Sequence, residues 1–309
     1  MKTIVESVLS PVANKKGKDV AVKRFRITDI PDVMDSMSWP QAALCMRRWI
    51  TGEPYEMPQD VKQGVTKPTA LPKKLVMDDL PFEWLFSGTT RVKPIIDKLK
   101  KELAVVQDYN SMVGRLYDTS VHMSPGLKNF MFKLQKLGAV NSDHRIESSA
   151  AFDFSSRSAM ELDELSQINF IVVGTGIWSQ ATDDLDDVYG ALGGFSIKIA
   201  ATKFSVVHDT AGPSKIRIDE VGLYVRDTYD FLNIDGDQLL GYWGFKGVIR
   251  PGPIDFLMNP DFIDRGSGRY FRVTNDSFNS YRKLHGKGED FLILSSVYKF
   301  ATSIEITLG

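Results

Sequence analysis

The sequence of 309 residues predicts an α+β protein: a mainly α N-terminal half followed by a curled, mostly antiparallel β-sheet or half-barrel with short helices. Two observations predict this class. Apolar residues recur at spacings of three and four before about residue 139, as in an amphipathic helix, whereas they alternate in several segments after about residue 165. We therefore expect a mainly helical region over residues 1–145 and a β-rich region over residues 146–309.

The first half is expected to begin with a strand and to continue with helices. Apolar and basic residues alternate in "KDVAVKRFRITDI", residues 18–30, which is typical of a strand with one wet face. A helix is predicted from Ser38 to Gly52, since proline is tolerated in the first helical turn and glycine commonly ends helices. Further helices are predicted over residues 89–118 and 124–138.

The second half is expected to consist of strands with short helices between them. A polar, serine-rich stretch over residues 139–165 is interpreted as a boundary or an exposed joint. The predicted strands cover residues 168–176, 194–207, 215–227, 289–300 and 303–309. The predicted short helices begin near Thr182 and near Asn275 or Asp276, and glycines end both, Gly193 in the first case and Gly286 in the second.

Composition narrows the range of partners. The 38 basic and 39 acidic side chains leave a formal charge of -1, so no overall field attracts nucleic acid. The lone Cys45 excludes an intramolecular disulfide and is expected to be a buried thiol. No signal peptide and no apolar run of the roughly 18 residues that a spanning helix needs is recognised, so we expect cytoplasmic synthesis and no transmembrane segment.

A cluster of candidate catalytic residues lies in "VGLYVRDTYDF", residues 221–231. Alternation along the strand places Asp227 and Tyr229 on one face, and Asp230 begins the following turn. Two carboxylates at this spacing are suited to bind a divalent cation or to act as acid and base. The alternative is structural: Asp227 pairs with Arg226, and Asp230 makes a turn-type hydrogen bond to the following backbone.

Other polar residues give weaker signals. The four histidines have no metal-ligand spacing, which argues against a zinc site. His285 is predicted in the last turn of a helix, where the helix dipole favours a cation and supplies a structural explanation. Lys287 lies between two glycines and is able to meet a phosphate, although "GKG" is not a phosphate-binding loop.

The run "YGALGGFSIKIAATKFSVV … VGLYVRDTYDF" resembles the C-terminal toxin domain of the colicin M-like bacteriocins. Asp227, Tyr229 and Asp230 fall on that family's Asp-x-Tyr-Asp signature. The resemblance implies a curled β-barrel that uses a divalent cation such as Mg²⁺. It also implies hydrolysis of the lipid-linked peptidoglycan precursor between undecaprenol and pyrophosphate.

The sequence departs from that family after the signature. The family has a His-Arg pair there, whereas this chain reads "LNIDGDQLLGYW". A pyrophosphate-cleaving site needs a proton donor or base and an anion clamp. His285 is the candidate for the catalytic proton transfer, and Arg282 and Lys287 are the candidates for substrate binding.

Over nearly its whole length the chain resembles a bacterial family of unknown function, number 6402, associated with polymorphic toxin and type VI secretion loci. The segments "IPDVMDSMSWPQAALCMRRWITG", "VRDTYDF … GDQLLGYW" and "FNSYRKLHGKGEDFLILSS" carry this resemblance. It implies an antibacterial effector that a secretion needle delivers to the target periplasm and that a cognate immunity protein neutralises. The alternative is a non-enzymatic secretion adaptor or toxin-neutralising protein that binds through exposed aromatics in "GYWGFKG" and "RYFRVTNDSF".

Overall fold

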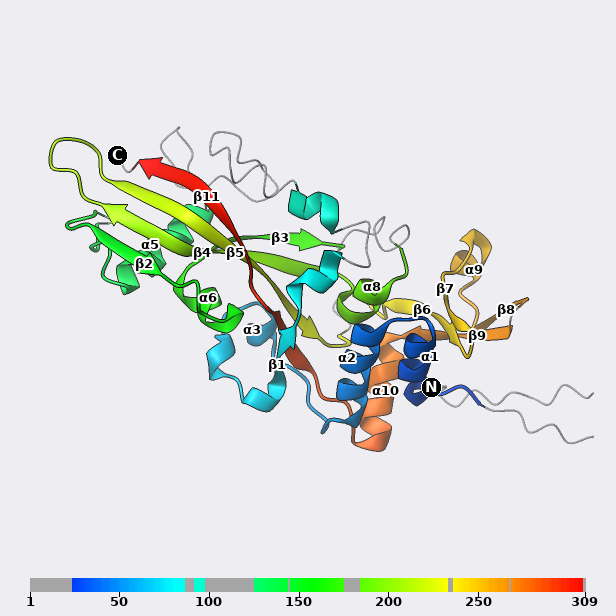
Figure 1. Cartoon of the computed structure of the whole chain (residues 1–309). Coiled ribbons are helices and arrows are strands. Elements are labelled where there is room, and N and C mark those ends of the chain that lie inside the picture. The colour runs from blue at the N-terminus through cyan, green and yellow to red at the C-terminus, as the bar shows by residue number, and fades with distance from the viewer. Residues whose placement is uncertain are drawn as a thin grey trace, which may run out of the picture. The chain divides into compact units, whose positions relative to one another are not determined.

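The structure is a computed structural model that describes residues 24–86, 92–97, 125–143, 145–174, 184–232, 236–266 and 268–307. Helices and a curled sheet are both present, so the expected α+β class is confirmed (Figure 1). The elements group into two compact units, each built from separate chain segments. The described residues of the first unit fall within 24–57, 185–191 and 229–291, and those of the second within 58–184, 192–228 and 292–307.

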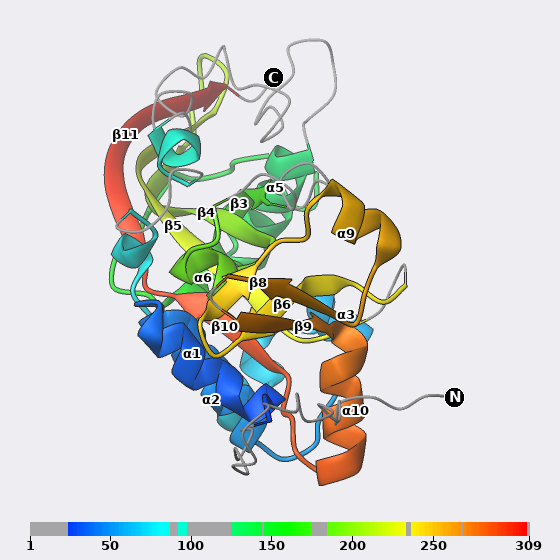
Figure 2. The same ribbon diagram turned by 90° about the vertical axis from the view of Figure 1, so that its right-hand side faces the viewer.

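A seven-stranded sheet dominates the second unit. Its strands are β1 (Val76–Leu80), β2 (Ala150–Asp153), β3 (Gln167–Val173), β4 (Phe195–Val207), β5 (Lys215–Tyr229), β10 (Phe291–Ser295) and β11 (Tyr298–Thr307). The long strands β4 and β5 pair antiparallel at the centre, β2 and β3 both pair antiparallel with β4, and β11 pairs antiparallel with β5. β10 lies between β5 and β1 in the sheet, and it pairs parallel with β1. Figure 2 shows the curl of β5 and β11.

The two faces of this sheet differ in chemistry. Val221, Leu223 and Val225 of β5 lie on one face, and β4 places apolar residues directly opposite them, which makes a continuous core. Tyr224 and Arg226 lie on the other face of β5 and are also buried. A central strand that is covered on both faces is expected to contain consecutive buried residues. In β5 these residues run from Val221 to Arg226.

Short helices surround the sheet of the second unit. They are α3 (Gln59–Lys62), η2 (Pro68–Ala70), η3 (Lys73–Leu75), η4 (Phe82–Phe86), α5 (Pro125–Lys136) and α6 (Ala159–Leu165). A reciprocal pair of bonds starts α6: Ser158 Oγ accepts from Glu161 N, and Glu161 Oε2 accepts from Ser158 N. Both α5 and α6 contact β3, and α6 also contacts β4.

The first unit combines helices with a four-stranded sheet. Its helices are η1 (Ile27–Asp29), α1 (Ile30–Ser36), α2 (Pro40–Thr51), α8 (Asp187–Leu192), α9 (Pro253–Met258) and α10 (Asn275–His285). The sheet has the order β7 (Gly247–Ile249), β6 (Leu239–Gly244), β9 (Gly268–Thr274) and β8 (Phe262–Arg265), with antiparallel pairing throughout. The buried Trp49 of α2 meets Phe231 and Phe278 edge to face, with ring centres 4.9 and 5.4 Å away.

A buried carboxylate holds the start of α2. Asp187 accepts hydrogen bonds from Ala42 N at 2.8 Å and from Gln41 N at 3.3 Å. These amides belong to the first helical turn, which has no intrahelical acceptor for them and carries a partial positive charge. Asp187 therefore ties α8 to the N-terminus of α2 within the first unit.

Many expected elements are confirmed. The helices predicted at Ser38–Gly52, 124–138 and near Asn275 appear as α2, α5 and α10, and the segments predicted as strands contain β3, β4, β5, β10 and β11. Cys45 is buried, as expected. Residues 93–97 of the predicted helix 89–118 are helical, and most of the remainder lies outside the described residues, as does Thr182.

Other expectations differ from the structure. The C-terminal end of the predicted strand 18–30 is helical, the stretch 139–165 contains β2 and α6, and β1 lies in the half expected to be helical. The segments "GYWGFKG" and "RYFRVTNDSF" contribute to β6 and β9. Tyr242, Trp243 and Tyr270 are buried rather than exposed, whereas Phe245 is exposed, as expected. The two compact units do not test whether residues 1–145 have a separate role, so that division stays a prediction.

Strands β6 and β9 lie close together at Gly244, so a substitution at this residue tests how tightly the two strands pack. A Cβ atom at Gly244 would lie 2.5 Å from the Arg269 carbonyl oxygen, a backbone atom that cannot rotate away. We expect Gly244→Ala to lower the free energy of unfolding by about 1–3 kcal/mol. Urea denaturation of the full chain measures this. The control is Gly266→Ala, since nothing lies within 4 Å of its added Cβ; equal losses in both variants would contradict the explanation.

Candidate functional site

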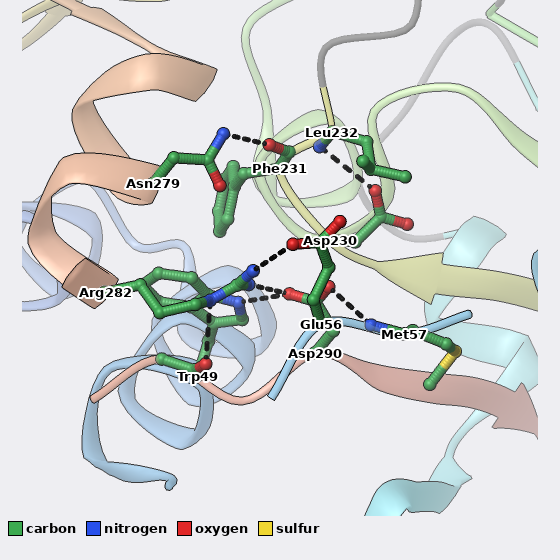
Figure 3. A network of polar contacts seen from close by, with 10 residues as sticks. Trp49, Glu56, Met57, Asp230, Phe231, Leu232, Asn279, Arg282 and Asp290 are labelled. Atoms are coloured by element: carbon green, nitrogen blue, oxygen red, sulfur yellow. Dashed lines mark hydrogen bonds and ion pairs between the residues drawn. The ribbon is translucent and has the colours of Figure 1, made fainter. Parts of the chain in front are cut away.

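A buried carboxylate, Asp290, organises the polar residues of the first unit, and Figure 3 shows this network. Asp290 is 1% exposed and lies directly before β10. Its Oδ1 accepts from Trp49 Nε1 at 2.9 Å, and its Oδ2 accepts from Met57 N at 3.0 Å. Arg282 of α10 also donates to it through Nη2. Asp290 therefore connects α2, the segment after it and α10.

Arg282 is held inside the same network. Its Nε donates to the Gly288 carbonyl at 3.0 Å, its guanidinium lies 5.2 Å from the ring centre of Trp49, and Nη1 is 3.8 Å from Glu56. The side chain is only 11% exposed. Its guanidinium donors meet Asp290 and a carbonyl, so Arg282 has a structural role in this network. Its expected role in substrate binding stays a prediction.

Burial raises the pKa of the Asp290 carboxyl above its ordinary value. Removal of the carboxylate from water is the largest cause, and the nearby charge of Asp230 acts in the same direction. The hydrogen bonds from Trp49 and Met57 and the charge of Arg282 oppose the increase. A buried charge of this kind remains tolerable only while its donors stay in place.

The Asp-x-Tyr-Asp residues have different environments. Asp227 is half-buried in β5. Tyr229 ends that strand and is buried: its ring stacks on Phe291 with centres 5.2 Å apart, and its hydroxyl lies 3.8 Å from the sulfur of Met46. Burial also holds the pKa of the Tyr229 phenol well above its ordinary value. Tyr229 is therefore a core residue in the first unit, and its expected catalytic role stays a prediction.

Asp230 forms the turn expected from its position. Its Oδ1 accepts a hydrogen bond from Leu232 N at 3.2 Å, while Asn279 of α10 donates to the Phe231 carbonyl at 2.9 Å (Figure 3). This bond confirms the turn-type hydrogen bond that the structural alternative predicts for Asp230. Asp230 as a residue is half-buried.

His285 and Lys287 lie at the C-terminal end of α10. His285 is the last residue of the helix, as expected; it is exposed, and its ring centre is 4.7 Å from that of Tyr281. Lys287 is exposed as well, and its ammonium donates to the Thr51 carbonyl at 3.3 Å. Each side chain therefore has a local contact in the first unit, and both are reachable from solvent.

A cation at Asp227 and Asp230 would have few protein ligands. Within the part of the chain that the structure describes, no group of three or more His, Cys, Asp or Glu side chains is arranged to hold a metal ion. Two carboxylates are nevertheless a sufficient protein contribution for Mg²⁺, which usually keeps several waters and takes further ligands from substrate phosphates. Binding of a divalent cation by Asp227 and Asp230 stays a prediction.

The sequence analysis did not single out Asp290, Trp49 or Met57. The sequence held one indication of the role of Asp290. This acidic residue stands directly before the five residues of β10, all of which are buried. A charged group at the edge of such a run needs partners, but the spacing does not identify them. Trp49 and Met57 are separated from Asp290 by more than 230 residues of chain.

Comparison with known proteins gives one match. A family model described as "Family of unknown function (DUF6402)" matches residues 25–309. No curated protein and no solved structure matches the chain. Within the described part of the chain, none of the helices has the length and apolar character that a membrane-spanning helix needs.

The Asp290 network predicts a large stability effect. We expect Asp290→Ala to lower the free energy of unfolding by about 3–5 kcal/mol, because the variant leaves the Arg282 charge buried without its partner. Chemical denaturation of the full chain measures the change. Asp264→Ala is the matched control: it also removes an aspartate that pairs with an arginine, Arg269, but on the exposed surface, and we expect no measurable change. A small effect of Asp290→Ala would show that the network does not hold the first unit together.

Proposed function

Because this chain belongs to DUF6402, a family of unknown function, we propose a function from its own residues: it is an antibacterial effector with a colicin M-like hydrolase activity. The proposed substrate is the lipid-linked peptidoglycan precursor, and the proposed reaction is hydrolysis of the phosphoester bond between undecaprenol and pyrophosphate. The observation that carries the proposal is the Asp-x-Tyr-Asp sequence at the end of β5, the second of two long antiparallel strands.

The proposed roles follow the chemistry of the accessible residues. Asp227 and Asp230 activate the attacking water and hold the divalent cation, which supplies positive charge for the phosphate oxygens. His285 is the exposed proton donor or acceptor, and Lys287 is the exposed cation for the substrate phosphates. Tyr229 and Arg282 support the site from the core, since both are buried or engaged in structural contacts.

Delivery completes the proposal. The producer makes the protein in its cytoplasm, a type VI secretion needle transfers it, and the hydrolase acts in the periplasm of the target cell. Residues 1–145 serve loading or delivery, and residues 146–309 carry the toxin activity. A cognate immunity protein protects the producer, as the sequence resemblance to toxin-associated families implies.

Expression of the chain with and without a periplasmic export signal tests this proposal. We expect growth arrest or lysis only with export, and we expect Asp227→Asn to abolish the effect while the variant stays folded by circular dichroism, because the carboxylate charge is lost. Asp264→Asn, an exposed aspartate outside the signature, is expected to remain toxic. An exported Asp227→Asn protein as toxic as the unmodified chain would falsify the proposed mechanism.

A second candidate function is a non-enzymatic secretion adaptor or toxin-neutralising protein, and α9 favours it. Ile254, Leu257 and Met258 are 77%, 83% and 71% exposed. Their spacing of three and four places them on one face of the helix. Asp255 anchors this helix by accepting hydrogen bonds from Gly252 N and Arg265 Nη2. An anchored helix with exposed apolar side chains is suited to bind another protein.

The adaptor function predicts that α9 carries partner binding. We expect a variant with serine at positions 254, 257 and 258 to lose co-purification with the secretion-needle component, because it removes the apolar contact area. The matched control places serine at Leu284, which is 71% exposed on α10, and should retain binding. If the α9 variant still co-purifies while the exported chain is toxic, the effector function is favoured.

A further inference from the structure

A second group of charged residues lies entirely within the second unit, on the polar face of the seven-stranded sheet. Lys198 of β4 lies directly opposite Tyr224 of β5, and the next pair on this face joins Ser196 to Arg226. Side chains directly opposite each other in an antiparallel pair share a face. Lys133 of α5 reaches α6 beside this face, because its ammonium donates to the backbone carbonyl of Asp163 at 2.7 Å.

Lys133, Lys198 and Arg226 carry three positive charges, and they share the negative charge of Asp163. Asp163 Oδ1 accepts from Tyr224 at 2.8 Å, and its Oδ2 lies 3.6 Å from Arg226 Nε, beyond hydrogen-bond distance. The other acidic residue near Lys133 is Glu164, which already pairs with Lys67 at 3.1 Å. Among the described residues, the charge of Asp163 therefore acts on Arg226, Lys133 and Lys198.

Within the described residues, the hydrogen bonds of Arg226 and Lys133 go to neutral carbonyl groups, and Lys198 contacts an aromatic ring. Arg226 is 7% exposed; its Nη2 donates to the Val61 carbonyl at 2.9 Å, and its Nε is buried with no hydrogen-bond partner. Lys198 places its ammonium 4.4 Å from the ring centre of Phe170. Lys133 donates to the Asp163 backbone carbonyl at 2.7 Å, which is a neutral acceptor.

The lysine pKa values agree with this excess of positive charge. Burial is the largest cause in both cases: it lowers the pKa of Lys133 to about 8 and also lowers that of Lys198. Repulsion from neighbouring cations adds to the decrease, and the attraction of Asp163 only partly offsets it. A buried arginine and half-buried lysines of this kind are stabilised when an anion joins them.

We propose that Lys133, Lys198 and Arg226 form a binding site for a phosphate or pyrophosphate group. A guanidinium and two ammonium groups present several N–H donors to the oxygens of such an anion, and the nearby carboxylate leaves their net charge positive. The site uses neither Asp227 nor Asp230, so it goes beyond the proposed hydrolase chemistry and does not depend on it.

The rim of this site has an apolar component. Phe170 and Val172 of the edge strand β3 lie opposite Lys198 and Ser196 of β4, and each is 44% exposed. An exposed apolar edge beside buried cations suits a ligand that joins a phosphate group to a hydrocarbon. Free pyrophosphate and a lipid-linked pyrophosphate share the anionic part, and the hydrocarbon distinguishes them.

Isothermal titration calorimetry of the full chain with inorganic pyrophosphate at low ionic strength tests the anion site. We expect saturable binding that Lys198→Gln weakens about tenfold or more, because a charged hydrogen bond is lost, and that Lys198→Arg largely retains. Lys203→Gln is the matched control on the same strand, since its ammonium is 3.8 Å from Glu220 on the more exposed part of β4. It should bind as the unmodified chain does.

A second titration with farnesyl pyrophosphate distinguishes the two sources of the anion. Tighter binding than for pyrophosphate, lost in Phe170→Ser, indicates a lipid-linked ligand, and equal affinities indicate that the free anion suffices. Both titrations are made without a divalent cation, which the proposed hydrolase site needs, so a failure of the toxicity assay leaves this inference intact. Absence of binding to both probes, or equal affinity in Lys198→Gln and the unmodified chain, overturns the proposal.

Discussion

Strand β5 is buried on both faces from Val221 to Arg226, and the second unit is arranged around this constraint. On one face, alternate aliphatic side chains pack into the core and need no further partner. On the other face, Tyr224 and Arg226 carry polar groups that cannot be buried alone. Asp163 at the end of α6 and the Val61 carbonyl supply the partners, which fixes where α6 and the segment near α3 meet the sheet.

The first unit also buries a charged group, and its partners balance that charge in a different way. Its buried carboxylate, Asp290, has a paired arginine and two further donors, so charge and hydrogen bonds are both balanced. Arg282 belongs to this balance, and Tyr229 belongs to the aromatic core around Phe291. Residues that suit a catalytic site by type therefore serve folding here. The chemistry proposed for the signature rests on Asp227 and Asp230, whose carboxylates are half-buried.

The two units thus treat buried charge in opposite ways. In the first unit an acid is surrounded by donors, whereas in the second unit Asp163 is shared among an arginine and two lysines. Folding alone does not require the second arrangement, because apolar residues of similar size are usually at least as stabilising as buried charges. The positive charge of these described residues is the observation on which the proposed anion site rests.

The sequence by itself determined those helices, strands and turns whose signals lie within a short stretch of neighbouring residues. Periodicity and helix-ending glycines identified α2, α5, α10 and the pair β4 and β5, and residue type identified the turn at Asp230. The short strands β6 to β9 escaped prediction because glycines and aromatics interrupt their alternation.

Only the tertiary structure decided which polar side chains are accessible and what surrounds them. Spacing along β5 placed Asp227 and Tyr229 together, yet the burial of Tyr229 depends on Met46 and Phe291, which are distant in sequence. The partners of Asp290 and the charge excess around Asp163 are likewise set by long-range packing. Burial and electrostatic balance depend on contacts between distant segments, and local periodicity carries no information about them.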